Sequence, residues 1–276
     1  MIQSEKYKFI EMCIVPFPVR SISSTYLFVL PSVDGKRQMT FYKNKVDSME
    51  DNLMILPYPK AKSVQLHTIK YKALFDDLEK SVFKPPTYSY PMYDMRMSNS
   101  CALMPESYVP VIQHGSYLVS ICENFQDLNR VDPSVFTLPP SIFPFFAKHY
   151  NSSFGYLVCR LKEGKHKYEP LCYSHDLIEE KKLFVPTLHY HDHGNGNIKT
   201  DLADWDHMIY SCGTTKYANQ EYMSYKENKL LWKRFPIEYQ LGIEKPIRCA
   251  EISGNYPNKD IAFELEKNDT QPTLCA

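Results

Sequence analysis

Glycine is scarce in this sequence, and the glycine-rich loops that bind nucleotide phosphates are absent. Only nine of the 276 residues are glycine. Neither G-x-x-x-x-G-K-[ST] nor G-x-G-x-x-G occurs; Gly194 and Gly196 form only G-x-G, with no apolar helix pattern directly after them. The G-x-S-x-G turn that carries the nucleophile of α/β-hydrolases is also missing. These absences argue against ATP, GTP or NAD binding by a standard motif and against a nucleophile-elbow hydrolase.

Closely spaced cysteines are missing as well. Eight cysteines occur, but no two of them form C-x-x-C, so a zinc ribbon is excluded. Without a secretory leader, free thiols are the default state, and such cysteines are typically small buried apolar residues. Cys212 lies near His207 in the sequence and could form a Cys–His pair. A buried structural cysteine is the more typical interpretation.

The sequence has neither an excess of one charge nor a long apolar run. Lys plus Arg and Asp plus Glu both number 32, so the basic excess typical of nucleic-acid-binding proteins is missing. The longest stretches without Asp, Glu, Lys or Arg, which include residues 107–122 and 133–147, are shorter than the roughly 20 residues that a membrane-spanning helix needs. The first residues show no basic segment followed by an apolar one. We therefore expect a soluble, cytoplasmic protein with no nucleic-acid or membrane partner.

What the sequence does contain favours strands. Tyrosine is abundant at 21 and proline at 20, and apolar residues make up 43% of the chain. Tyrosine suits half-buried strands, and proline suits rigid connections and edge strands. Asp34-Gly35 and His114-Gly115 each separate two apolar runs, which predicts two hairpins.

Three segments carry helix signals. Apolar residues recur at helical spacing in residues 71–82 and 216–234, and a proline lies near the start of residues 140–150. Late strands are expected at residues 248–252 and 261–265. The fold class that follows is α+β, with strand-rich mixed or antiparallel sheets and a few peripheral helices.

Proline and tyrosine cluster in one stretch without a clear period, which indicates a connection between two lobes. This pattern predicts an N-terminal strand-rich lobe over residues 1–84, a connecting segment over 85–106 and a C-terminal α+β lobe over 107–266. Residues 267–276 are polar and are expected to form a mobile tail. A single compact domain is also compatible with this chain length.

The run LFVPTLHYHDH at residues 183–193 is the most distinctive feature of the sequence. Side chains alternate along a strand, so Leu183, Val185, His189 and His191 would share one face. The candidate metal ligands are His189, His191, Asp204, Asp206 and His207. Imidazole and carboxylate ligands suit a divalent transition metal such as Zn or Fe. His193 is expected in the following Gly-Asn turn.

A simpler interpretation of the histidine run is also open. Histidines beside a Gly-Asn turn are often exposed loop residues or satisfied polar groups at a strand end. The Glu that follows the His pair in double-stranded β-helix metalloenzymes is absent, so Asp201 or Asp206 would have to replace it.

Five segments resemble a family of uncharacterised soluble proteins found in bacteria and microbial eukaryotes. The resemblance covers most of residues 50–212 and implies a common fold, without an activity, cofactor or partner. The segments are MILPYP at 54–59, SICENFQDLNRVDPSVFTLPPSIF at 120–143, FGYLVCRL at 154–161, LFVPTLHYHD at 183–192 and ADWDHMIYS at 203–211.

Two hypotheses of function follow. The first is a protein-interaction or structural module that binds a protein partner or forms a homo-oligomer; it rests on the tyrosine-rich composition and the missing catalytic motifs. The alternative is a metal-dependent hydrolase or oxygenase, in which the ion activates a bound water or polarises a substrate oxygen. The sequence names neither the partner nor the substrate.

Overall fold

A computed structural model describes residues 14–67, 108–190, 201–212, 221–222, 235, 237–239 and 247–265. Of these residues, 57% lie in strands and 9% in helices. The expectation of mixed and antiparallel sheets with few helices is confirmed. The described part of the chain is mostly β, however, rather than α+β.

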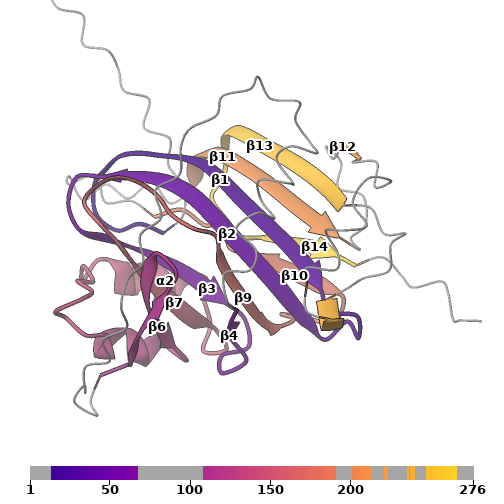
Figure 1. Ribbon diagram of the computed structural model, residues 1–276, viewed down its shortest axis with the longest axis horizontal. Coiled ribbons are helices and arrows are strands. Elements are labelled where there is room, and N and C mark those ends of the chain that lie inside the picture. Colours follow the sequence, from indigo (N-terminus) through magenta and orange to yellow (C-terminus); the bar gives the residue numbers. More distant parts are fainter. Residues whose placement is uncertain are drawn as a thin grey trace, which may run out of the picture.

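An eight-stranded sheet dominates the structure (Figure 1). Its strand order is β12-β13-β11-β1-β2-β9-β4, and β8 also pairs with β2. β1 and β11 run parallel, while the other paired strands are antiparallel. The strands are β1 (Val19–Pro31), β2 (Arg37–Ser48), β4 (Gln65–Leu66), β8 (Gly164–Lys167), β9 (Leu171–Asp176), β11 (Leu202–Cys212), β12 (Glu221–Tyr222) and β13 (Ile247–Pro257).

A four-stranded antiparallel sheet packs against the large one, and a two-stranded sheet contributes side chains to the core between them. The four-stranded order is β3-β7-β6-β5, and the third sheet is β10-β14. The remaining elements are β3 (Asn52–Tyr58), β5 (Val111–His114), β6 (Tyr117–Cys122), β7 (Gly155–Leu161), β10 (Lys182–Val185), β14 (Ile261–Glu264), the 3-10 helices η1 (Phe125–Arg130) and η3 (Ile237–Tyr239), and the helix α2 (Ile142–His149).

Both predicted hairpins are confirmed. The β1–β2 turn contains Asp34, whose carboxylate accepts hydrogen bonds from Ser32 Oγ at 2.6 Å and from the Lys36 N–H at 3.1 Å. Gly35 has φ +67°, a conformation that glycine adopts without strain. In the β5–β6 turn, Gly115 has φ +59°, which matches the first central position of a type II′ hairpin turn.

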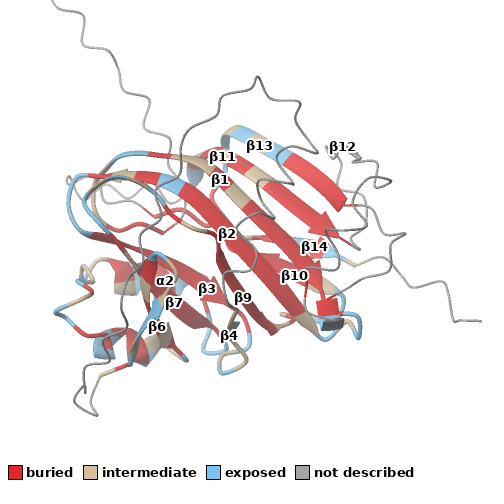
Figure 2. Cartoon of the chain, viewed as in Figure 1, coloured by how far each residue is buried: buried red, intermediate tan, exposed pale blue. Residues whose placement is uncertain are grey.

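Strand alternation sorts the apolar side chains into three cores. On β1, Leu27 and Val29 face the core between the large and four-stranded sheets. Phe28 and Leu30 face outward, into a core that includes Phe235 and Tyr239. A third core lies between the far face of the four-stranded sheet and α2. The central strands β2, β3, β7 and β9 are accordingly buried along most of their length (Figure 2).

The helix predictions have different outcomes. The prediction for residues 140–150 is confirmed by α2. Residues 71–82 lie outside the described residues. Within 216–234 the structure describes only Glu221–Tyr222, which form β12 and pair with β13. The helix prediction is wrong there, because the sheet edge offers this segment hydrogen-bond partners that its side-chain period does not reveal.

Strands from both predicted lobes pair within the same sheets. β1 lies beside β11, and β3 lies beside β7, so backbone hydrogen bonds join residues before 84 to residues after 107. The connecting segment 85–106 and the tail 267–276 lie outside the described residues, and the division into lobes stays a prediction. None of the described helices has the length and hydropathy needed to cross a membrane.

Candidate interaction site

Two of the predicted metal ligands, His189 and His207, lie together in the core between the sheets. Their rings stack with centroids 5.1 Å apart and planes 13° apart. The Trp205 ring lies 5.2 Å from His189 and 5.0 Å from His207. Each histidine is only 2% exposed. These three residues, the imidazole–indole cluster, are core residues that a substrate in solvent does not reach.

The two predicted carboxylate ligands lie on the opposite side of β11. Trp205 and His207 face the inner core, and because side chains alternate along a strand, Asp204 and Asp206 face outward. Asp206 Oδ2 accepts a hydrogen bond from the Ser24 N–H at 3.2 Å. The same alternation separates Cys212 from His207, so a Cys–His pair does not form.

The five-residue metal set is therefore only partly assembled in the described structure. His191 and the turn residue His193 lie outside the described residues. Within the described residues, no three His, Cys, Asp or Glu side chains are grouped so as to hold a metal ion. The prediction of a Zn or Fe site over residues 189–207 now depends on His191.

Burial sets the protonation state of the cluster. It lowers the pKa of His207 to about 3, because the charged imidazolium would lose its hydration. Neither ring nitrogen of His207 has a hydrogen-bond partner among the described residues. At neutral pH this ring is therefore an uncharged aromatic packing element.

Side chains from the β13–β14 connection hold the segment that carries His189. Asn258 accepts from the His189 N–H at 2.7 Å and donates to its carbonyl at 2.9 Å, as a neighbouring strand would. Asp260 accepts from the N–H groups of Thr187 and Leu188 at 2.8 and 2.9 Å, and from Tyr150 Oη at 2.8 Å. Burial raises the pKa of Asp260 to about 6, although these three hydrogen bonds oppose the rise. No local pattern marks Asn258 or Asp260, because their partners lie about 70 residues or more away.

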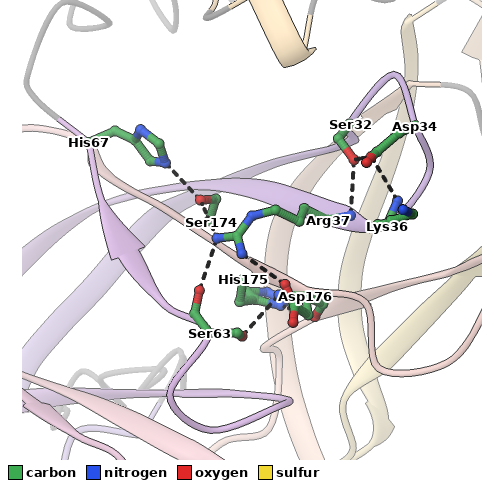
Figure 3. Close-up of polar contacts among 9 residues, drawn as sticks. All are labelled: Ser32, Asp34, Lys36, Arg37, Ser63, His67, Ser174, His175 and Asp176. Carbon is green, nitrogen blue, oxygen red and sulfur yellow. Dashed lines mark hydrogen bonds and ion pairs between the residues drawn. The ribbon is translucent and has the colours of Figure 1, made fainter.

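A second polar network surrounds Arg37 and braces the edge strand β4 (Figure 3). Arg37 Nη1 contacts Asp176 Oδ1 at 2.8 Å. Arg37 Nη2 donates to the Ser63 carbonyl at 2.9 Å and to Ser174 Oγ at 3.1 Å. His67 Nε2 lies 2.8 Å from Ser174 Oγ. This Arg37 brace ties the chain before and after β4 to β2 and β9.

The hydrogen bonds of the brace are compatible with a neutral His67 ring. Arg37 has only donors, so Ser174 Oγ accepts from it. Ser174 can then donate its own proton to His67 Nε2, which leaves His67 neutral with its proton on Nδ1. Burial lowers the pKa of His67, which agrees with a neutral ring. Smaller contributions come from Glu238, which raises this pKa, and from Arg37, which lowers it.

Ser174 and His67 resemble a catalytic dyad in their distance alone. Ser174 is fully buried at 0% exposure, whereas a nucleophile must touch its substrate. Its two hydrogen bonds are structural in effect, since one joins β9 to Arg37 of β2 and the other joins it to His67, the residue that follows β4. The described residues thus bring the polar side chains of both networks into packing and bracing roles.

The brace ends at a rim where the edges of two sheets meet. β4 is the last strand of the large sheet, and β5 is the last strand of the four-stranded sheet. His67 directly follows β4, and the His114 ring at the end of β5 lies against the His67 backbone. Burial lowers the pKa of His114, while a hydrogen bond with the His67 backbone partly opposes the shift.

β5 is the open part of this rim. Within the described residues it pairs only with β6, and Ile112 is 41% exposed. The two-residue turn makes His114 and Tyr117 the last hydrogen-bonded pair, so Val111 and Gln113 direct their N–H and C=O groups away from β6. The edge also lacks charged residues and contains no proline between Val111 and His114, the devices that usually block strand addition.

The fold defines the class of the protein, which is mostly β and is built around an eight-stranded and a four-stranded sheet packed together. Comparisons with known proteins identify no family for it. No family model matches the sequence, and no curated protein is significantly similar to it. A solved structure of a mutated baculovirus P35 after caspase cleavage has 13% identity and a TM-score of 0.49, over 89% of this chain and 100% of that chain. P35 in a complex with caspase-8 has 13% identity and a TM-score of 0.47, over 89% of this chain and 97% of that chain. The function of this chain must therefore be inferred from its own residues, and the family resemblance in residues 50–212 stays a prediction.

Proposed function

We propose that this protein is an interaction module that binds an extended segment of a partner protein along the edge of β5. The observation that carries the proposal is the backbone of this edge strand, which within the described part of the chain pairs on one side only, beside the exposed side chain of Ile112. An extended peptide can add to such an edge as a further strand. Main-chain hydrogen bonds then supply affinity, and alternate side chains supply specificity.

The Arg37 brace supports the proposal because it holds the rim in one position before a partner arrives. A fixed edge loses less conformational entropy on binding than a mobile one. Arg37 holds Ser63, which precedes β4, and it also binds Ser174, whose hydroxyl contacts His67 after β4. His114 at the end of β5 lies against this anchored chain.

Two substitutions test the edge directly. Val111→Pro removes an outward N–H at the first residue of β5, where proline is tolerated in a strand, and should weaken partner binding about tenfold. Ile112→Lys removes the apolar contact and adds a charge to the edge, and should weaken binding at least tenfold. Val33→Lys is the matched control, because Val33 is 58% exposed and lies in the β1–β2 turn.

The measurement begins with capture of a partner from a native extract by the wild-type protein and its identification. The affinity of the purified partner is then determined for the three variants, and amide hydrogen exchange is followed at residues 111–113. Weaker binding by both edge variants, normal binding by Val33→Lys and slower exchange at these amides would support the proposal. Equal affinity for all three variants would show that the partner binds elsewhere.

The metal-dependent enzyme stays a prediction that requires His191 as a further ligand beside His189 and His207. Elemental analysis of protein purified without chelators tests it. Stoichiometric metal that disappears in His189→Ala plus His191→Ala would support it, and metal-free protein whose thermal stability does not respond to added Zn or Fe would contradict it.

A further inference from the structure

The outer face of the eight-stranded sheet, which is the face turned away from the four-stranded sheet, changes from apolar to charged along its strands. On β2 the outward residues are Met39 and Phe41 at one end and Lys45 and Asp47 towards the other, since Val46 faces the inner core. Met39 and Phe41 are buried, whereas Lys45 is exposed. One half of this face is therefore apolar, and the other half is charged.

The change occurs at the same level on the neighbouring strands because the register aligns them. Tyr26 of β1 pairs with Lys43 of β2 and with Met208 of β11, and Met208 pairs with Glu251 of β13. Beyond this row the outward residues are mostly polar, with Leu202 at the far end of β11 as an apolar exception. Figure 2 shows the corresponding change along β13, from buried to exposed. Phe235 and Tyr239 belong to the core on the apolar half only.

The charges on the exposed half are largely separated by sign across the sheet. Acidic residues lie on one side of β1, on β11 and β13. The other side, on β2 and β8, carries three lysines and one carboxylate, Asp47, which is paired with Arg20. Lys45 pairs with Lys167 across β2 and β8, which places both amines on the same face. We call this surface the charged half; its charged members are Asp204, Asp206 and Glu251 on the acidic side, and Lys45, Lys165, Lys167 and the paired Asp47 on the mainly basic side.

We propose that a second copy of this chain binds the charged half, around a twofold axis that runs along β1. Such a rotation turns the second copy over and exchanges the two sides of β1, so β11 of one copy faces β2 of the other. Asp206 and Lys45 lie on either side of β1 at the level of Ser24, which contacts both of them. Asp206 of each copy then faces Lys45 of the other, and the pair forms twice.

Apolar residues at the border of the charged half fit the same axis. Leu202, 49% exposed, is the next outward residue on β11 after Asp204. Met49, 51% exposed, directly follows β2. The rotation brings these two exposed side chains towards each other in both halves of the dimer. Asp47, which would face Asp204, is already paired with Arg20 at 2.9 Å.

The size of the surface sets the expected strength. From β13 to β8 the face spans four strand spacings of about 4.8 Å, and its polar part is about 20 Å long, which is roughly 400 Å² per copy. Stable complexes bury about 800 Å² per partner. We therefore expect a weak dimer that depends on salt, because its central contacts are exposed ion pairs.

Sedimentation velocity over a range of protein concentrations tests the dimer, at about 0.05 M and about 0.5 M salt. We expect self-association of the wild-type chain at low salt and at least tenfold weaker association at high salt. Lys45→Glu and Asp206→Lys should each abolish self-association, because each places like charges opposite one another. A mixture of these two variants should associate, because both contacts then join opposite charges.

A matched mixture controls for general attraction between proteins of opposite net charge. Lys148→Glu on α2 and Glu180→Lys after β9 change the net charge equally at exposed sites away from the charged half. This mixture should associate no more than the wild-type chain alone does. A wild-type chain that stays monomeric at low salt, or association that survives Lys45→Glu, would overturn the proposal. If Asp206→Lys does not fold, the comparison of Lys45→Glu with the wild type still tests the dimer. Val111→Pro should leave dimerisation unchanged, and it therefore distinguishes failure of this proposal from failure of the proposed binding at the β5 edge.

Discussion

The imidazole–indole cluster and the Arg37 brace show two ways in which this fold accommodates histidine, one with fully buried rings and one with a half-buried ring. In the cluster, His207 is 2% exposed and stacks against His189 and Trp205, with burial as the cause of its low pKa. In the brace, the Ser174 hydroxyl lies 2.8 Å from His67 Nε2 and accepts a hydrogen bond from Arg37 at 3.1 Å. The cluster contributes mainly through packing, whereas the brace contributes through directed hydrogen bonds. The two should therefore respond differently to substitution and to pH.

The largest effect is expected from removing the indole. Trp205→Ala leaves a cavity between the sheets and should lower the free energy of unfolding by about 3–5 kcal/mol. Chemical denaturation monitored by circular dichroism measures this change. Tyr256→Ala, at a 45% exposed residue of the neighbouring strand, is the control and should change stability by less than about 1 kcal/mol. Equal losses for both variants would contradict a packing role for the cluster.

The next prediction separates the cluster from the brace by pH. The pKa of His207 is about 3 in the folded chain, against about 6.5 in the unfolded chain, so the unfolded state binds more protons between these values. The stability supplied by neutral His207 is complete above pH ~6.5 and is lost as the pH falls towards 3. His207→Leu removes this loss and should be about 2 kcal/mol less sensitive than the wild type to acidification from pH ~7 to ~4.5.

Denaturation curves at several pH values measure this difference. Other buried titratable groups also change the free energy of unfolding with pH. Burial lowers the pKa of His175 to about 4, which adds to the acid sensitivity. Asp260 acts in the opposite direction between about pH 6 and 4, because its folded pKa of about 6 lies above the unfolded value. The test is therefore the difference between His207→Leu and wild type, and identical pH profiles would exclude a titrating role for His207.

A smaller effect is expected from the centre of the brace. Arg37→Ala removes the donors to Asp176, to the Ser63 carbonyl and to Ser174, and should lower the free energy of unfolding by about 2 kcal/mol. Arg20→Ala is the matched control, because Arg20 pairs with Asp47 but its side chain is 53% exposed; its loss should be below about 1 kcal/mol. The proposed edge binding should also weaken in Arg37→Ala, and a normal affinity would show that the brace does not position the β5 edge.

The smallest effect concerns a single hydroxyl. Ser174→Ala should lower stability by about 1 kcal/mol. It should also raise the pKa of His67. In the wild type the Ser174 hydroxyl donates to the neutral ring and so favours the neutral form, and the variant loses this hydrogen bond. Proton NMR titration of the imidazole measures the shift. A lower pKa of His67 in this variant would mean that the ring donates to Ser174 instead.

Much of the fold could be predicted from local signals, but the candidate sites could not. Asp34-Gly35 and His114-Gly115 identify hairpins because a turn depends on a few adjacent residues. The helix expected over residues 216–234 is wrong at Glu221–Tyr222, where pairing with β13 overrides the local period. The Arg37 brace joins residues more than 100 positions apart, and no sequence period connects them.

The histidine run shows where sequence information ended. By itself the sequence predicted that Leu183, Val185 and His189 would share one face, because side chains alternate along a strand, and it left open whether the histidine would be exposed. The structure buries all three of these side chains. Only the tertiary structure decided what would meet that face. The parallel pairing of β11 with β1 brought Trp205 and His207 inward and turned Asp204 and Asp206 outward, away from His189. Such a choice depends on which strands become neighbours, and strand pairing minimises the free energy of the whole chain rather than that of any one segment.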